Sequence, residues 1–239
     1  MKKDLAPIII QTNCHFKIIT DIFTRPKRIY TFLNPVSYLD ASKQVSIFER
    51  FDGIFADGSL LVKAIRILYG KKVNRRSFDM TSLAPELFHF AEKENKTIYI
   101  VASKQEEVEK ACTIFQKQYP NLNIIGYKNG YFQNEKEQEE TIKKIIQTNP
   151  DFLIVGMGAT MQEKFLLKAK DMGFNGIGFT CGGFIHQTAK NEIDYYPEWI
   201  NKYNIRFLYR MYKEKHTRKR YIKAGIIFPW VFLKDRLVK

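Results

Sequence analysis

The sequence predicts an α/β fold in which helices cover both faces of a mostly parallel sheet, followed by a basic helical appendage at the C-terminus. Three observations lead to this prediction. Short runs rich in Ile, Val, Phe and Tyr recur between Arg28 and Thr180. Helical patterns separate these runs, and this alternation is typical of parallel strands joined by helices. After about Pro197 the chain becomes basic and aromatic.

The expected strands are short buried runs, several of which end in small or turn-forming residues. In chain order they are IYTFLN at 29–34, DGIFAD at 52–57, TIYIVAS at 97–103, NIIGY at 123–127, DFLIVGMG at 151–158 and GIGFTCGG at 176–183. Together they predict a Rossmann-like sheet.

Helical signals lie between these strands. Ser103 and Glu106 have the spacing of a capping box, and the apolar stripe that follows ends at Pro120. Asn134 is a suitable N-cap for an acidic first turn, and the helix that it begins should stop at Asn149 and Pro150. A further helical pattern covers 196–223 and forms the start of the appendage.

A length of 239 residues with 45% hydrophobic content suits one large domain with an appendage, which we place at 1–196 and 197–239. Nothing approaches the roughly 20 apolar residues that span a bilayer, and the apolar run after the N-terminus is too short for a secretory signal. We therefore expect a cytoplasmic domain. Cys14, Cys112 and Cys181 lack metal-type spacing, so reduced and mostly buried thiols are expected.

The formal charge of +14 predicts a polyanionic partner: nucleic acid, an anionic membrane surface or a phosphorylated substrate. Between Lys202 and Lys223 there are nine cations and only one acid, Glu214, which is a net +8. The apolar residues after this segment include Phe228, Trp230 and Phe232, a combination that suits the lipid headgroup boundary. The alternative is a helix pair docked on the core with a solvated basic face.

Ligands of parallel sheets bind at the carboxyl ends of the strands, so the residues there are candidate site residues. Asn34, Asp57 and Gly58 hold such positions, as do the GMGAT of 156–160 and the CGG of 181–183. Asp57 followed by Gly58 taken alone favours an ordinary turn, and the position at a strand end favours a functional role. GMGAT could offer backbone N–H groups to a phosphate, but neither complete glycine-rich phosphate motif is present, and its glycines could simply permit close packing.

Three further residues are candidates with open alternatives. Gln162 and Glu163 begin the helix after GMGAT and could hydrogen-bond a base or a sugar, or could form a solvated first helical turn. The four histidines are scattered without metal-ligand spacing, and only His186, close to CGGF, is a candidate.

The order of several short motifs resembles the WecG/TagA/CpsF family of bacterial glycosyltransferases over roughly 30–229. These motifs are FLN at 32–34, ADG at 56–58, FDM at 78–80, NGYF at 129–132, PDFLIVGMG running into Gln162 and Glu163, GGF at 182–184 and FLYR at 207–210. Each is weak alone, but their succession is hard to obtain by chance.

The resemblance implies a membrane-associated, inverting, metal-independent enzyme that is similar to N-acetylmannosaminyltransferases. Such enzymes move a sugar from a UDP-sugar to a polyprenyl-diphosphate-linked saccharide for cell-surface polysaccharide. The resemblance makes Asp57 the catalytic base and places Arg210 and Arg220 over the diphosphate. Its donor-pocket positions are Asn34, Gly130, Tyr131 and Gln162. We expect no cofactor and no metal, in keeping with the lack of a D-x-D pair.

The chain departs from the family pattern near the donor. Phe32 replaces a usual threonine, unless Thr31 supplies the hydroxyl. Arg75 is displaced from the usual position of an arginine before the aspartate matched by Asp79, and both are expected to bind substrate. His186 stands close to a position that is often aspartate. These differences bear on the identity of the sugar more than on the class of reaction.

Two other classes of function would suit a basic α/β chain. A nucleic-acid-binding protein would use the basic tail, but the sequence has no RNP, helix-turn-helix or finger motif. A nicotinamide-dependent oxidoreductase would need a glycine fingerprint after its first strand, which is absent. We therefore expect no nucleic acid as partner. The membrane association that the resemblance implies leads us to expect a location at the inner face of the plasma membrane. The sequence leaves self-association open.

Overall fold

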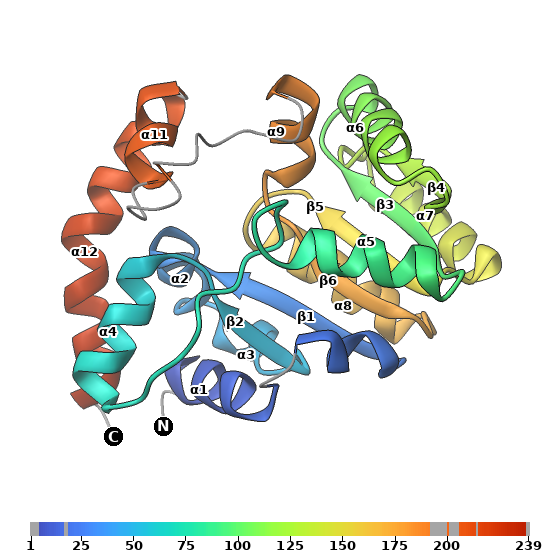
Figure 1. Ribbon diagram of the computed structural model, residues 1–239. Helices are drawn as coiled ribbons and strands as arrows, with labels where there is room; N and C mark the ends of the chain where they lie inside the picture. Colours follow the sequence, from blue (N-terminus) through green and yellow to red (C-terminus); the bar gives the residue numbers. More distant parts are fainter. Residues whose placement is uncertain (1–4, 17–18, 192–199, 201–205, 214, 238–239) are drawn as a thin grey trace.

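The computed structural model describes residues 5–16, 19–191, 200, 206–213 and 215–237. The predicted domain boundary between 196 and 197 lies outside this part of the chain. The described residues form a six-stranded sheet with the order β2-β1-β6-β5-β3-β4, and every neighbouring pair is parallel. The predicted fold class is therefore confirmed (Figure 1).

Each predicted apolar run forms one strand. The strands are β1 (Arg28–Leu33), β2 (Gly53–Ala56), β3 (Thr97–Ala102), β4 (Asn123–Lys128), β5 (Phe152–Gly156) and β6 (Ile177–Thr180). All residues of β2, β5 and β6 are buried, as expected for strands covered on both faces. The edge strand β4 alternates between exposed and half-buried residues instead.

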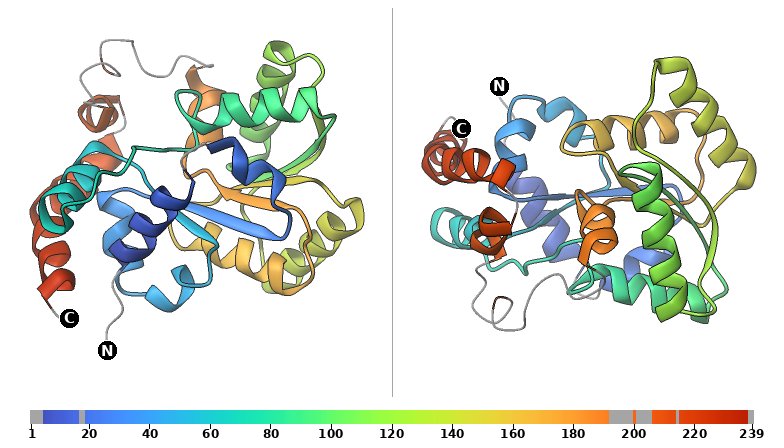
Figure 2. Two further views of the ribbon diagram at one scale, coloured as in Figure 1. Left: turned by 60° about the horizontal axis from the view of Figure 1, so that its bottom comes forward. Right: turned by 90° about the horizontal axis from the view of Figure 1, so that it is seen from above.

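Helices lie on both faces of the sheet, as the two views in Figure 2 show. Before β3 they are α1 (Leu5–His15), the 3-10 helix η1 (Ile19–Thr24), α2 (Pro35–Ala41), α3 (Val45–Phe48), α4 (Ser59–Tyr69) and α5 (Leu83–Lys93). Beyond β3 they are α6 (Gln105–Gln118), α7 (Glu135–Thr148), α8 (Met161–Asp171), α9 (Phe184–Asn191), α11 (Arg206–Lys213), the 3-10 helix η2 (Lys215–Thr217) and α12 (Arg218–Leu237). Two hydrophobic clusters, one on each face, join these helices to the strands.

The helix ends confirm one predicted cap and correct another. Asn134 caps α7 by accepting the backbone N–H of Glu137 at 2.9 Å, and Asn149 ends that helix in the left-handed conformation. The capping box predicted at Ser103 and Glu106 is wrong by one residue. Ser103 has a φ of 51°, α6 begins at Gln105, and the Glu107 carboxylate accepts the Lys104 N–H at 3.4 Å.

The appendage differs from the single helical segment predicted for 196–223. Most residues between 196 and 205 lie outside the described part, η2 separates α11 from α12, and α12 continues through Pro229 to Leu237. Helix α12 packs against α2 and α4. Phe228 and Phe232 are fully buried there, against Tyr38, so their predicted place at a lipid boundary is wrong.

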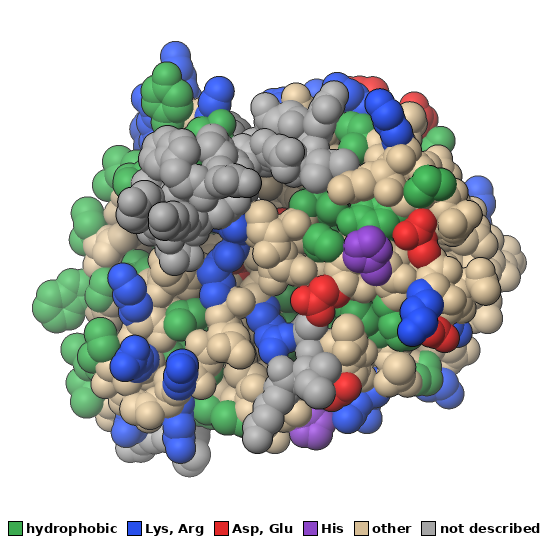
Figure 3. All heavy atoms as spheres, viewed as in Figure 1, with side chains coloured by type: hydrophobic (Ala, Val, Ile, Leu, Met, Phe, Trp, Pro, Cys, Tyr) green, Lys and Arg blue, Asp and Glu red, His purple; other side chains and the backbone are tan. Residues whose placement is uncertain are grey.

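The opposite face of α12 is exposed. Trp230 has 73% of its surface exposed, and Ile222, Ile226 and Leu237 lie on the same side of the helix. Figure 3 shows hydrophobic and basic side chains side by side on the flank of the molecule where α4 and α12 lie. No helix in the described ranges is both long enough and apolar enough to cross a membrane.

Candidate active site

A pocket of about 860 Å³ opens at the carboxyl edge of the sheet. Residues that follow β1, β2, β3, β5 and β6 line it, which is where parallel sheets bind ligands. Helices α11 and α12 complete its wall with Arg206, Arg210, Arg220 and Tyr221. All the predicted site residues line this pocket except Glu163, which lies behind the wall.

Asp57 directly follows β2, at the edge of the sheet. Its N–H donates to the carbonyl of Leu33 on β1 at 2.8 Å, which extends the ladder by one residue. Gly58 then adopts a φ of +96°, which glycine reaches without steric cost, and α4 begins at Ser59. The turn and site interpretations of Asp57 are thus compatible, because the turn itself leaves the carboxylate facing the pocket.

The position of Asp57 changes its proton affinity. Burial raises the pKa of the Asp57 carboxyl above its ordinary value, although 29% of the side chain is exposed to the pocket. The guanidinium of Arg75 opposes this rise, the nearby carboxylate of Asp79 adds to it, and Arg206 and Arg210 oppose it more weakly. A carboxylate with a raised pKa is a stronger base than an ordinary aspartate, which is the property that proton abstraction requires.

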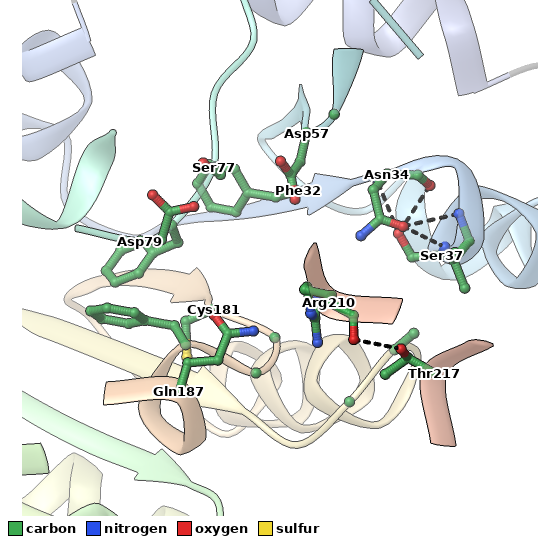
Figure 4. A pocket seen from close by; sticks show the side chains of 18 of the residues that line it. Phe32, Asn34, Ser37, Asp57, Ser77, Asp79, Cys181, Gln187, Arg210 and Thr217 are labelled. Carbon is green, nitrogen blue, oxygen red and sulfur yellow. Dashed lines mark hydrogen bonds between the residues drawn. The ribbon is translucent and has the colours of Figure 1, made fainter. Parts of the chain in front are cut away.

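Arg75 lies between two carboxylates of the pocket. Its Nε is 3.6 Å from Asp57 Oδ1, and its Nη2 is 3.7 Å from Asp79 Oδ2. Nη2 also donates to Ser77 Oγ at 2.9 Å, and Arg206 donates to Asp79 Oδ2 at 3.2 Å. Figure 4 shows Asp57 and Arg210 facing the same space from different elements. The displacement of Arg75 in sequence therefore does not remove it from the site.

Asn34 serves two purposes at the end of β1. Its Oδ1 accepts the N–H groups of Val36 and Ser37 at 2.9 and 3.0 Å, which caps α2. Pro35 occupies the first turn of the helix, where its missing N–H costs nothing. Because Oδ1 is committed to the helix, the Nδ2 donor is the atom of Asn34 that can serve a ligand in the pocket (Figure 4).

Gln162 is held by a buried polar network behind the pocket wall. Its Oε1 accepts the N–H of Gly182 at 3.0 Å, and its Nε2 donates to Glu163 Oε1 at 2.9 Å. Thr31 donates to the same Glu163 oxygen at 2.8 Å. Glu163 is only 1% exposed, so a solvated helical turn is excluded, and burial raises the pKa of its carboxyl. Thr31 is also fully buried, which excludes it as a substitute hydroxyl in the pocket.

Glycines allow close approach on the β3 and β5 side of the pocket. A Cβ on Gly156 would lie 2.7 Å from the sulfur of Cys181, and a Cβ on Gly130 would lie 2.9 Å from Met157. Packing therefore accounts for Gly156 in the GMGAT motif. Tyr131 follows Gly130 at the rim, with 68% of its surface exposed.

His186 lines the pocket from α9 and contacts Glu107 from α6. Its Nδ1 is 2.7 Å from Glu107 Oε1, so a carboxylate stands beside the imidazole. Cys181 lies nearby, but burial raises the pKa of its thiol to about 12, which keeps it protonated and unsuited to nucleophilic attack.

Several pocket residues were not predicted from the sequence, among them Arg206 and Glu107. Arg206 lies one helical turn before Arg210, so an i, i+4 search around the predicted tail arginine would have found it. Glu107 lies in the first turn of α6, after β3, as Gln162 lies in the first turn of α8, after β5. The strand-end rule that identified Gln162 would therefore also have identified Glu107. No group of three or more His, Cys, Asp or Glu side chains in the described ranges is arranged to hold a metal ion.

Comparison with known proteins assigns the chain to a family. The model of the glycosyl transferase WecG/TagA/CpsF family matches residues 12–239. The chain is 35% identical over 211 residues, 88% of each chain, to a Shigella boydii protein described as a UDP-Gal:alpha-D-GlcNAc-diphosphoundecaprenol beta-1,4-galactosyltransferase.

Two further relatives are described as N-acetylglucosaminyldiphosphoundecaprenol N-acetyl-beta-D-mannosaminyltransferases. The one from Bacillus subtilis is 28% identical over 126 residues, 53% of this chain and 48% of the relative. The one from Staphylococcus aureus is 27% identical over 176 residues, 73% of this chain and 64% of the relative. These matches give the nucleic-acid-binding alternative no support. The chain belongs to the WecG/TagA/CpsF family and is a glycosyltransferase.

Proposed function

We propose that this glycosyltransferase moves a sugar from a UDP-sugar to a polyprenyl-diphosphate-linked saccharide, with inversion at the anomeric carbon and without a metal ion. The observation that carries the proposal is the Asp57 carboxylate, which lies in the strand-end pocket with a raised pKa. A carboxylate with a raised pKa and a set of guanidinium groups face one space, and this is the chemistry that sugar transfer from a nucleoside diphosphate needs.

In the proposed reaction, Asp57 takes the proton of an acceptor hydroxyl as that oxygen attacks the anomeric carbon. The bond from that carbon to the UDP oxygen breaks on the opposite face, so the configuration inverts and UDP leaves as an anion. A positioned general base typically contributes roughly 10²- to 10⁴-fold to the rate.

Arginine side chains are proposed to stabilise the leaving diphosphate. Arg210 and Arg220 both line the pocket, and guanidinium groups match phosphate oxygens in geometry and stay charged at every relevant pH. Arg75 supports a reaction without metal, because its guanidinium already lies between the two carboxylates, Asp57 and Asp79, that a cation would otherwise bridge.

The rest of the pocket is proposed to hold the donor nucleotide. The Asn34 amide, the backbone at Gly130, the ring of Tyr131 and the Gln162 side chain face this region. The Glu107 and His186 pair adds a carboxylate and an imidazole, both able to hydrogen-bond ribose hydroxyls or a base edge.

The donor sugar is proposed to be a hexose, with galactose tested first. The relative that matches 88% of each chain is named for galactose transfer, whereas the N-acetylmannosaminyltransferases match less of their own length. The acceptor is proposed to be a saccharide on a polyprenyl diphosphate, because all three relatives are named for such acceptors.

Because such an acceptor lies in a bilayer, the protein is proposed to bind the inner face of the plasma membrane. The exposed side of α12, with Trp230 and Ile226 beside Lys223 and Lys234, supports this. Apolar side chains among cations suit the boundary between headgroups and acyl chains.

The test is UDP release from a panel of UDP-sugars with a short-chain polyprenyl-diphosphate-GlcNAc acceptor. We expect acceptor-dependent release with one donor, and a loss of about 10²- to 10⁴-fold in kcat for Asp57→Asn with UDP binding retained. Asp171→Asn, an exposed aspartate far from the pocket and paired with Arg50, is the matched control and should leave the rate unchanged. Full activity of Asp57→Asn would rule out the proposed base.

A further inference from the structure

Helix α4 has a second apolar face that points away from the core. It begins one residue after Gly58 and buries Leu61 and Ile65 against the sheet. On its outer side Ile67 is 78% exposed and Leu60 is 42% exposed. A surface helix of a globular domain normally places polar residues on that side. Ile67 and Leu60 therefore form an apolar side of α4 that faces away from the core.

The charged residues of α4 and of the segment that follows it are all positive. Between Asp57 and Asp79 the sequence contains six cations and no acidic residue. Lys63 and Arg66 are exposed on α4 itself, and Lys71 and Lys72 are exposed directly after it. Apolar side chains set among cations, without acids, match an anionic lipid surface.

Helix α4 lies next to α12. The two helices lie side by side in both views of Figure 2. Their C-terminal ends meet where Arg236 Nε donates to the carbonyl of Leu68 at 3.4 Å and its guanidinium lies 5.1 Å from the ring centre of Tyr69. The exposed Ile222, Ile226 and Trp230 of α12 extend the same kind of surface.

The N-terminal halves of both helices line the pocket. Leu60 and Lys63 of α4 line it, and so do Arg220 and Gly225 of α12. A binding surface formed by both helices would therefore place the pocket next to the bound partner.

We propose that α4 and α12 together form the membrane-binding surface, so that the α/β domain itself, and not the appendage alone, contacts anionic lipid beside the pocket mouth. The inference rests on the proposed lipid-linked acceptor. An anionic bilayer is the occupant that the charge favours, because a second copy of this chain would bring cations against cations.

Flotation with vesicles of phosphatidylglycerol and phosphatidylcholine tests the electrostatic part. Each cation near such a surface is worth about fivefold in binding, so Arg66→Gln/Lys71→Gln should lower the partition coefficient by roughly 30-fold at low salt. Lys143→Gln/Lys144→Gln removes the same charge from exposed positions on α7 and should change it far less. Equal losses in the two variants would overturn the proposal, because net charge alone would then explain them.

Ile67→Asn tests the apolar part, since it changes no charge. It should weaken vesicle binding even at high salt, where surface charges are screened. Transfer to a short-chain soluble acceptor should stay at the wild-type rate, whereas transfer to an acceptor in vesicles should fall. If Ile67→Asn floats with the vesicles as wild type does, the inference is wrong, whereas the proposed function is unaffected. Failure of the soluble reaction in wild type would instead count against the proposed function.

Light scattering of the same variants tests whether a second copy of this chain, instead of lipid, covers this surface. If wild type self-associates and Ile67→Asn is monomeric, the face is an interface between copies, and the lipid proposal is wrong. An unchanged mass together with reduced flotation is the supporting result.

Discussion

The guanidinium of Arg75 lies against the carboxylate of Asp57, with Nε 3.6 Å from Oδ1. Burial raises the pKa of Asp57 and Arg75 partly opposes that rise, so Arg75 helps to determine the pH at which the carboxylate is ionised. A general base must be ionised to accept a proton. The contact therefore links a residue that is displaced from the family pattern to the pH range of the reaction.

Arg75→Gln should move the acid limb of the pH profile of kcat/KM to higher pH. Loss of the guanidinium removes an influence that lowers the pKa of Asp57, so the carboxyl stays protonated over a wider range. The measurement is UDP release as a function of pH. Arg50→Gln, which removes an exposed arginine distant from the pocket, should leave the limb in place. An acid limb that stays fixed or moves to lower pH in Arg75→Gln would contradict the prediction.

Asp57→Asn should stabilise the protein at neutral pH. The folded-state pKa of Asp57 is raised above its unfolded value, so ionisation costs more in the folded protein than in the unfolded chain. That cost is absent below the ordinary aspartate value of about 3.9 and is fully present above the folded pKa. The excess free energy of unfolding of the variant should therefore shrink as the pH falls toward that value. Denaturant titrations at several pH values measure it, and an excess that does not depend on pH would refute this origin.

Glu163 should act through Gln162 rather than by contact with a ligand. Glu163→Gln keeps an acceptor for Thr31 and for the Gln162 amide, and we expect near wild-type kcat and donor KM. Glu163→Ala removes that acceptor and releases the Gln162 side chain, so donor KM should rise about tenfold, which corresponds to the loss of one hydrogen bond. A purely structural role would lower stability in Glu163→Ala without a selective change in donor KM.

The strands could be predicted because each is a buried apolar run closed by turn residues, a signal that local sequence carries. The same rule placed Asn34 and Asp57 at strand ends, and hence in the pocket. The contact of Arg75 with Asp57 could not be predicted this way, since it depends on how the loop after α4 returns across the sheet edge. The path of a loop produces no periodic pattern in the sequence from which such a contact could be predicted.

The errors at the C-terminus have a local cause. The prediction grouped Phe228, Trp230 and Phe232 by composition, because the expected helical pattern ended at 223. In the structure α12 continues through this segment, and the helical period then separates Phe228 and Phe232 from Trp230 onto opposite faces. The predicted set of aromatic residues therefore divides into two buried rings and one exposed ring.

Arg210→Ala and Arg220→Ala should lower kcat more than they raise donor KM. Negative charge grows on UDP as it leaves, so these guanidinium groups should interact more strongly with the transition state than with the bound donor. The loss expected for one such donor is about 10²- to 10³-fold. Lys219→Ala, an exposed cation beside Arg220, is the control when a soluble acceptor is used. A change confined to KM would make both arginines ordinary binding residues.

Phe232→Ala and Trp230→Ala should separate the two functions of α12. Phe232 is fully buried, with its ring centre 5.2 Å from that of Tyr38 and 5.8 Å from that of Tyr69, so truncation should cost about 3–5 kcal/mol and loosen the helix from α2 and α4. Arg220 lies on the same helix and lines the pocket, so detachment of α12 should lower kcat even with a soluble acceptor.

Trp230 is exposed, so Trp230→Ala should change the free energy of unfolding by less than about 0.5 kcal/mol and spare the soluble reaction, while vesicle binding falls. Hydrogen exchange of α12, flotation and UDP release measure the three quantities. Fast exchange in α12 of Phe232→Ala with an intact soluble rate would show that α12 need not be docked for catalysis. That result would also remove the reason to place Arg220 over the diphosphate, because an undocked helix could not hold it in the pocket.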